Sequence, residues 1–284
     1  MAKVFTFAEV VNEDNDLYNE PVLSQETIGK HMTLIDVSKT DRIRETGLYT
    51  RGHQNKWVVG DTYVKMDTLG YESYAEIMAC WLMDNIENLK VDFVRYYPCC
   101  IAEDGKPIGY GCYCENFLGA QEQEIQLGKI LKQYNMDMHI YYDDLIKIIK
   151  DKCNLDISDY VLQTLQIDAL TRNSDRHLYN MSIIRRNIDE SFRLGYIYDN
   201  GDGFLSNMVK YPKNQGWQEQ YAGVQSKPFK TDFTLPVEGY EPLKIKYWVF
   251  RNSIDDVGSE QLNKALWVVD RALKETEGNI WLHV

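Results

Sequence analysis

The spacing of hydrophobic residues predicts two strand hairpins in the first part of the chain, with one helix between them. Residues 57–59 and 62–65 predict two strands joined by a Gly-Asp turn, and residues 93–97 and 108–113 predict a second hairpin around an Asp-Gly turn. Between the hairpins, residues 72–83 carry apolar side chains at intervals of three and four, which predicts an amphipathic helix.

After about residue 119 the pattern becomes mostly helical. Two short strands, 181–184 and 192–198, interrupt the predicted helices, and a polar loop is expected at about 205–235. The helices are expected at about 119–134, 139–153, 157–171, 241–252 and 259–275. Strand pairs followed by helices predict an α+β fold of two lobes. We expect a strand-rich N-lobe over 1–117, a mainly helical C-lobe over 118–284, and a ligand cleft between them.

Composition narrows the class of partner. The chain has 284 residues and a net charge of −12, so a broad acidic surface would repel a nucleic-acid backbone, and direct nucleic-acid binding is not expected. A single nucleotide needs only a local positive pocket and a metal ion, so ATP is not excluded. No secretory signal and no apolar run long enough for a bilayer are found, which predicts a cytoplasmic protein without a membrane partner, with its six cysteines reduced.

The strongest chemical signal is the segment 173–184, Asn-Ser-Asp-Arg-His-Leu-Tyr-Asn-Met-Ser-Ile-Ile, followed by Asp199. Phosphoryl transfer needs a carboxylate near the attacking hydroxyl and oxygen ligands for Mg²⁺. Asp175 would orient or deprotonate the acceptor, and Asn180, five residues later, would bind the metal. A hairpin over 181–198 would bring Asp199 to the same ion. A polar turn with a helix cap is the alternative for this segment.

A second group of residues lies upstream. Gly52, Gln54 and Lys56 precede or begin a strand, where a glycine lets backbone N–H groups approach phosphate oxygens. Lys65 at the end of the next strand would neutralise phosphate charge. Such a lysine needs a carboxylate to hold it, and the following helix offers Glu72 and Glu76, which lie four residues apart on one face. Solvated charges are the alternative here.

Two further features are the segment where strands give way to helices and a group of four cysteines. The segment 114–119 contains Glu115 and Phe117, and it is where a hinge would place backbone groups against adenine. Four cysteines could form a zinc site, although adjacent strand residues point to opposite faces and free cysteines usually behave as small buried hydrophobes. These are Cys99, Cys100, Cys112 and Cys114.

These residues resemble the HipA-like kinases, a family of Ser/Thr kinases with a bilobal protein-kinase-like fold. Gly52-x-Gln54-x-Lys56 is similar to the family's phosphate loop, and 63–65 (Tyr-Val-Lys) to its ATP-binding strand. Residues 173–184 resemble its Asp-x-His-x-x-Asn-x-Ser loop, and 198–199 (Tyr-Asp) its metal-binding pair. The resemblance implies an enzyme that uses ATP and Mg²⁺, with Asp175, His177 and Lys65 as catalytic residues, Asn180 and Asp199 as metal ligands, and a protein Ser/Thr hydroxyl as acceptor. It implies the following nucleotide-binding residues: Gly52, Gln54, Lys56, Lys65, Glu72, Glu76, Glu115 and Phe117.

Three functions stay open at this point. The first is a HipA-like protein kinase, which Gly-x-Gln-x-Lys favours. The second is a lipid or small-molecule kinase, since Asp-Arg-His-x-x-Asn also occurs in phosphatidylinositol kinases. A pseudokinase that only binds nucleotide is the third possibility. Toxin members carry a long N-terminal subdomain and a phosphorylated Ser near the loop glycine. Here about fifty residues precede Gly52, which speaks against an antitoxin partner and antitoxin-dependent DNA binding. Residues 49–51 are Tyr-Thr-Arg and contain no Ser, which predicts that regulation by this phosphorylation is absent or altered. Lys227-Pro228-Phe229 is like a segment that follows the catalytic core in small members.

Overall fold

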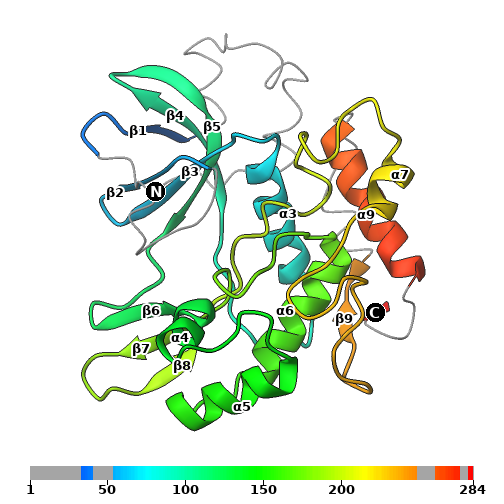
Figure 1. Ribbon diagram of the computed structural model, residues 1–284. Helices are drawn as coiled ribbons and strands as arrows, with labels where there is room; N and C mark the ends of the chain where they lie inside the picture. The colour runs from blue at the N-terminus through cyan, green and yellow to red at the C-terminus, as the bar shows by residue number, and fades with distance from the viewer. Residues whose placement is uncertain (1–32, 41–53, 248–259, 276–280, 284) are drawn as a thin grey trace.

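A computed structural model describes residues 33–40, 54–247, 260–275 and 281–283, and the account below concerns those residues. One part is a five-stranded sheet in the order β1-β4-β5-β3-β2, which Figure 1 shows at the upper left. All neighbours are antiparallel except β1 and β4. The strands are β1 (Thr33–Asp36), β2 (Lys56–Val59), β3 (Thr62–Met66), β4 (Tyr97–Glu103) and β5 (Lys106–Glu115).

One helix, α3 (Glu72–Asp84), packs against this sheet and joins it to the rest of the molecule. Its side chains are buried on almost every face, including Ala75, Met78, Ala79 and Leu82. A helix that is buried all round lies between other elements rather than on the surface. This helix therefore belongs to the main hydrophobic core, which continues into the helical part.

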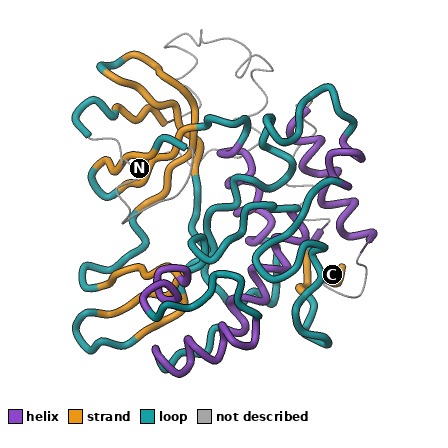
Figure 2. Tube along the Cα trace, viewed as in Figure 1, coloured by secondary structure: helices purple, strands orange, loops and turns teal. Residues whose placement is uncertain are grey.

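The remaining elements form a mainly helical part. It includes the small sheet β6-β7-β8, which Figure 2 shows at the lower left, below the larger sheet. The central helix of this part, α6, is buried along most of its length and contacts both α3 and α9. The elements are β6 (Glu122–Gln126), α4 (Leu127–Gln133), α5 (Tyr142–Cys153), α6 (Ser158–Thr171), β7 (Ser182–Arg186), β8 (Phe192–Leu194), α7 (Trp217–Ala222), β9 (Leu243–Ile245), α9 (Glu260–Glu275) and β10 (Trp281–His283).

Most of the predicted elements are confirmed. The first hairpin, the helix at 72–83 and the helices at 139–153, 157–171 and 259–275 are present with small shifts at their ends. The second hairpin turns at Asp104-Gly105 as predicted, but its first strand is displaced to 97–103 and shares only Tyr97 with the predicted 93–97. The model thus has the mixed α+β architecture that the sequence predicted. None of the helices in the described ranges has both the length and the apolar character that crossing a membrane requires.

Three expectations about elements were wrong. Residues 122–126 form β6 instead of the start of a helix, because their backbone pairs with β7. Residues 243–245 form strand β9 where a helix was expected, and 248–252 lie outside the described residues. The polar loop at 205–235 contains the short helix α7. In each case tertiary pairing or packing outweighs the local pattern.

The close approach of β5 to β3 gives a testable prediction. A Cβ at Gly111 would lie 1.8 Å from the carbonyl oxygen of Lys65, so Gly111→Ala must displace one of the two strands. We expect a loss of about 1–3 kcal/mol or more in the free energy of unfolding, measured by urea denaturation. Gly216→Ala is the control, because a Cβ there meets nothing within 4 Å. Equal stability of the two variants would contradict this packing.

Candidate active site

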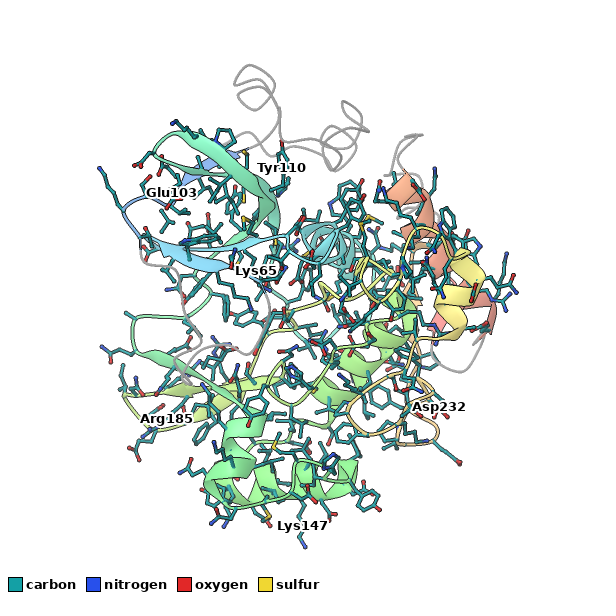
Figure 3. The ribbon with its side chains drawn as sticks, turned by 45° about the horizontal axis from the view of Figure 1, so that its top comes forward. Lys65, Glu103, Tyr110, Lys147, Arg185 and Asp232 are labelled. Atoms are coloured by element: carbon teal, nitrogen blue, oxygen red, sulfur yellow. The ribbon has the colours of Figure 1, made fainter. Side chains whose placement is uncertain are left out.

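Lys65 on β3 is the charged residue that connects the sheet to the helical part. Its Nζ donates a hydrogen bond to Glu76 Oε1 at 2.7 Å and to Asp199 Oδ1 at 3.1 Å. Figure 3 labels Lys65 at the edge of the sheet that faces the rest of the molecule. Burial by itself would lower the pKa of Lys65, but the carboxylates of Asp199 and Glu76 outweigh burial and raise the pKa well above its ordinary value.

Of the two glutamates predicted for this role, Glu76 contacts Lys65 and Glu72 does not. Glu76 is fully buried, and its second oxygen, Oε2, accepts a hydrogen bond from the backbone N–H of Asn200 at 2.8 Å. Glu72 instead accepts the backbone N–H of Leu69 at 2.7 Å, which ties the residues before α3 to the first turn of the helix. One carboxylate therefore links β3, α3 and the segment after Asp199.

Lys56 lies directly opposite Lys65 in the register of β2 and β3, so both side chains point to the same face of the sheet. Lys56 is buried, and burial lowers its pKa, while the negative charge of Asp199 partly offsets this. Gln54 lies two residues before β2 and is half-buried. Gly52 lies outside the described residues. Two ammonium groups thus approach Asp199 from adjacent strands.

Asp199 is held as a carboxylate in a strained backbone position. Burial would raise its pKa, but Lys65 and Lys56 lower the pKa below its ordinary value. Its φ of 60° lies in the left-handed region, which residues other than glycine seldom adopt and which is common at functional sites. The backbone thus makes an unusual turn at the residue that the sequence predicted as a metal ligand.

The segment 173–184 is organised around Arg176, whose side chain is completely buried. Arg176 Nε donates to Asp168 Oδ2 at 2.9 Å, and Nη2 donates to Asp168 Oδ1 and to Asn200 Oδ1. Nη1 donates to the carbonyl oxygens of Asn180 and Tyr198. Burial would lower the pKa of Arg176, but Asp168 raises it above its ordinary value. One side chain therefore fixes the loop relative to the Asp199 segment.

Asp175 and Asn180, the two polar ends of the loop, are joined directly. Asn180 Nδ2 donates to the carbonyl oxygen of Asp175 at 3.1 Å, which leaves Asn180 Oδ1 with no donor among the described residues. The Asp175 carboxylate is about half exposed, and its Oδ1 accepts a hydrogen bond from Lys227 Nζ at 3.0 Å. Asp175 is thus available at the surface of the site.

His177 lies between these residues but donates to none of them. Its Nδ1 is buried without a hydrogen-bond partner among the described residues, and its ring meets Tyr179 edge to face at 6.1 Å. Burial lowers the pKa of His177, and the charge of Asp175 only partly opposes this. Burial thus favours the neutral imidazole, which packs within the loop.

The geometry allows a test of fit for a divalent cation. Asn180 Oδ1 and Asp199 Oδ2 are hard oxygen donors, and neither receives a hydrogen bond from another described residue. Mg²⁺ typically takes one or two protein carboxylate or amide oxygens and completes its shell with water and phosphate. Across the described ranges, no group of three or more His, Cys, Asp or Glu could enclose a metal. The residues fit an ion shared with a phosphate ligand rather than a closed protein cage.

Among the described residues, the four cysteines do not form a group that could hold a zinc ion. All four cysteines are free and buried, and burial raises the pKa of each thiol. Cys99 belongs to a small hydrophobic cluster with Trp57 and Val64, whereas Cys112 and Cys114 belong to the main core. They pack as small hydrophobic side chains.

The predicted hinge residues lie where β5 leaves the sheet. Glu115 is the last residue of β5 and is exposed. Phe117 packs between Tyr63 of β3 and Tyr196, with ring centroids 6.1 and 5.2 Å away. Phe117 thus contacts both the sheet and the part of the chain that follows it.

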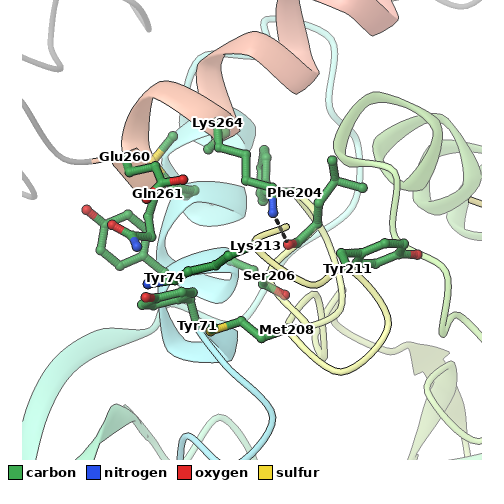
Figure 4. A pocket seen from close by; sticks show the side chains of 14 residues that line it. Tyr71, Tyr74, Phe204, Ser206, Met208, Tyr211, Lys213, Glu260, Gln261 and Lys264 are labelled. Carbon is green, nitrogen blue, oxygen red and sulfur yellow. Dashed lines mark hydrogen bonds between the residues drawn. The ribbon is translucent and has the colours of Figure 1, made fainter. Parts of the chain in front are cut away.

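The segment after Asp199 is anchored on its far side by α9. Phe204 and Leu205 have φ of 55° and 57°, and Lys264 Nζ donates to the Leu205 carbonyl oxygen at 2.9 Å. Figure 4 shows this bond beside a pocket that α3, α9 and residues 204–213 line. Burial lowers the pKa of Lys264 to about 8. This turn is consequently tied to a helix more than fifty residues later in the chain.

Sequence reasoning missed two acids near the site, the buried Asp168 and the partly buried Glu124. Asp168 looks like an ordinary polar position of a helix, and only its burial identifies it as the partner of Arg176. Glu124 on β6 accepts the hydroxyl of Ser182 at 2.8 Å, and burial raises its pKa. The segment containing Glu124 was expected to be helical, so the alternation of side chains along a strand was not considered for this residue.

The mixed α+β fold is similar to that of a solved kinase structure. No family model and no curated protein matched the sequence. Among solved structures, the chain is similar to the Helicobacter pylori proinflammatory kinase CtkA, with a TM-score of 0.55, 13% identity, and coverage of 85% of this chain and 94% of that one. It is also similar to HipA of Shewanella oneidensis, from a complex with HipB and operator DNA, with a TM-score of 0.42, 13% identity and coverage of 80% and 56%.

The Arg176–Asp168 pair gives a prediction about stability. Arg176→Met removes the charge and leaves Asp168 buried without its partner, so we expect about 3–5 kcal/mol of destabilisation in urea unfolding. The control is Arg185→Met, which removes a partly exposed pair with Glu190 and should cost about 1 kcal/mol or less. If Arg176→Met were as stable as Arg185→Met, the pair would not organise the loop.

Proposed function

We propose that this protein is an ATP- and Mg²⁺-dependent kinase of the HipA-like type that transfers the γ-phosphate to Ser/Thr hydroxyls of protein. The observation that carries the proposal is the contact of Lys65 with both Glu76 and Asp199. It places a buried ammonium beside a carboxylate that has a free oxygen, next to the loop of Asp175 and Asn180. We also propose that residues 1–117 and 118–284 are its two lobes and that it acts in the cytoplasm.

Each residue has a proposed role in this reaction. Lys56 and Lys65 would neutralise phosphate oxygens, and Glu76 would hold Lys65 in place. Asp175 would accept the hydrogen bond of the acceptor hydroxyl and take its proton as the new P–O bond forms. Asn180 and Asp199 would hold Mg²⁺, which when bound neutralises phosphate charge and orients the transferred group.

The remaining proposed roles rest on fewer side-chain contacts. Gly52 and Gln54 would approach the phosphates through the backbone before β2. Glu115 and Phe117 would border the adenine, since Phe117 lies between the sheet and Tyr196. His177 would support the loop by packing rather than by proton transfer. Glu72 would act only by holding the start of α3 in place, through the hydrogen bond that it accepts from the backbone N–H of Leu69.

Loss of phosphotransfer in three variants tests the proposal. Lys65→Ala, Asp175→Ala and Asp199→Ala should each lower the rate of label transfer from γ-labelled ATP with Mg²⁺ to casein or to the protein itself by about 100-fold or more. The control is Asp151→Ala, an exposed position of α5 that should leave the rate unchanged. Wild-type protein that is stabilised by ATP in thermal unfolding but transfers no label would favour the pseudokinase alternative.

The two glutamates of α3 allow a matched comparison. Glu76→Gln removes the charge that pairs with Lys65, so we expect the kcat of phosphotransfer to fall by about 10- to 100-fold. Glu72→Gln changes the same atoms four residues earlier, and kcat should stay within about threefold of wild type because Glu72 does not contact Lys65. A larger loss of kcat in Glu72→Gln than in Glu76→Gln would reverse the assignment.

A further inference from the structure

Lys227 is a cation without a role in the assignments above, although it contacts the proposed catalytic carboxylate. Its Nζ lies 3.0 Å from Asp175 Oδ1, and the two side chains are 50% and 46% exposed. Its positive charge also contributes to lowering the pKa of His177, which lies two residues after Asp175. Lys227 therefore lies at the open side of Asp175, whereas Lys56 and Lys65 lie with Asp199.

The loop that carries Lys227 is held by several contacts. Ser226 is buried and accepts the backbone N–H of Phe233 at 3.2 Å, while its own N–H donates to the carbonyl oxygen of Thr231. Phe233 is buried beneath the guanidinium of Arg172 at 4.7 Å, and Arg172 directly precedes the catalytic-loop segment. The loop is thus anchored to the same segment that presents Asp175.

The contact has little value for stability. An ion pair between two half-exposed side chains contributes about 0–1 kcal/mol. The contact instead constrains the orientation of the carboxylate. Lys227 donates to Oδ1, and no described residue donates to Oδ2 of the same carboxylate. A carboxylate held at one oxygen has its other oxygen in a defined position.

We propose that Lys227 is a positioning residue for Asp175, an inference that rests on the proposed function. Lys227 holds Oδ1, and Oδ2 accepts the proton of the acceptor hydroxyl. As that proton moves to Oδ2, the hydroxyl oxygen forms a bond to the γ-phosphorus, and the bond from phosphorus to the β,γ-bridging oxygen breaks with its electron pair leaving on ADP. Lys227 keeps its proton throughout, and Asp175 then releases the transferred proton to water.

The test compares Lys227→Met and Lys227→Arg with the control Lys230→Met. Phosphotransfer to casein is measured with γ-labelled ATP and Mg²⁺. ATP hydrolysis is the second readout. Lys230 lies in the same loop, and among the described residues its ammonium donates only to Thr234, while its backbone carbonyl accepts from Ser226 Oγ. We expect kcat of Lys227→Met to fall about 10- to 100-fold with KM for ATP within about twofold of wild type. Lys227→Arg should recover most of the loss, and Lys230→Met should match wild type.

Wild-type kcat in Lys227→Met, or a raised KM for ATP with kcat unchanged, would overturn the inference. If Lys227→Met unfolds at a lower temperature than Lys230→Met, the arginine variant decides: recovery of kcat supports positioning, and activity no better than that of the methionine variant contradicts it. A wild-type protein that neither hydrolyses ATP nor labels casein or itself would refute the proposed function first, before any variant is compared.

Discussion

The geometry of the site depends on the buried guanidinium of Arg176. Removing an arginine and a carboxylate from water costs several kcal/mol per ion, and the pair is tolerated only when the remaining polar groups are satisfied. Arg176 meets this condition, because its acceptors are the Asp168 carboxylate, two backbone carbonyl oxygens and the amide oxygen of Asn200. The requirement to fill every donor is what holds the loop and the Asp199 segment in one register, since a shift of either would leave a buried N–H unpaired.

Glu76 makes a comparable connection to the sheet. Its two oxygens accept hydrogen bonds from different parts of the molecule, Lys65 on β3 and the backbone of Asn200. A movement of α3 would break both bonds together and leave a fully buried carboxylate without a partner, which is costly in a low-dielectric interior. Asn200 is bound by both Arg176 and Glu76, so it is the point at which the loop, the helix and the sheet are coupled.

The sequence predicted the fold class and most elements because their patterns are local: regular helical spacing at 157–171 and Gly-containing turns in the hairpins. It failed at 122–126, where strand character comes from pairing with β7, and it did not predict β1, which pairs with a strand some sixty residues later. It also could not choose between Glu72 and Glu76, which share a helix face. The role of Asp168 depends on burial, which no local pattern reports.

Two carboxylates of the candidate site are partly neutralised although the chain as a whole is acidic. The chain has a net charge of −12, yet Asp199 and Asp175 each have one oxygen neutralised by a lysine, Lys65 and Lys227 respectively, and one oxygen without a donor among the described residues. Neutralising one oxygen lowers the repulsion that a nearby phosphate would meet, while the second keeps its capacity to bind a cation or accept a proton. The compensation is local to these two carboxylates and leaves the net charge of the chain unchanged.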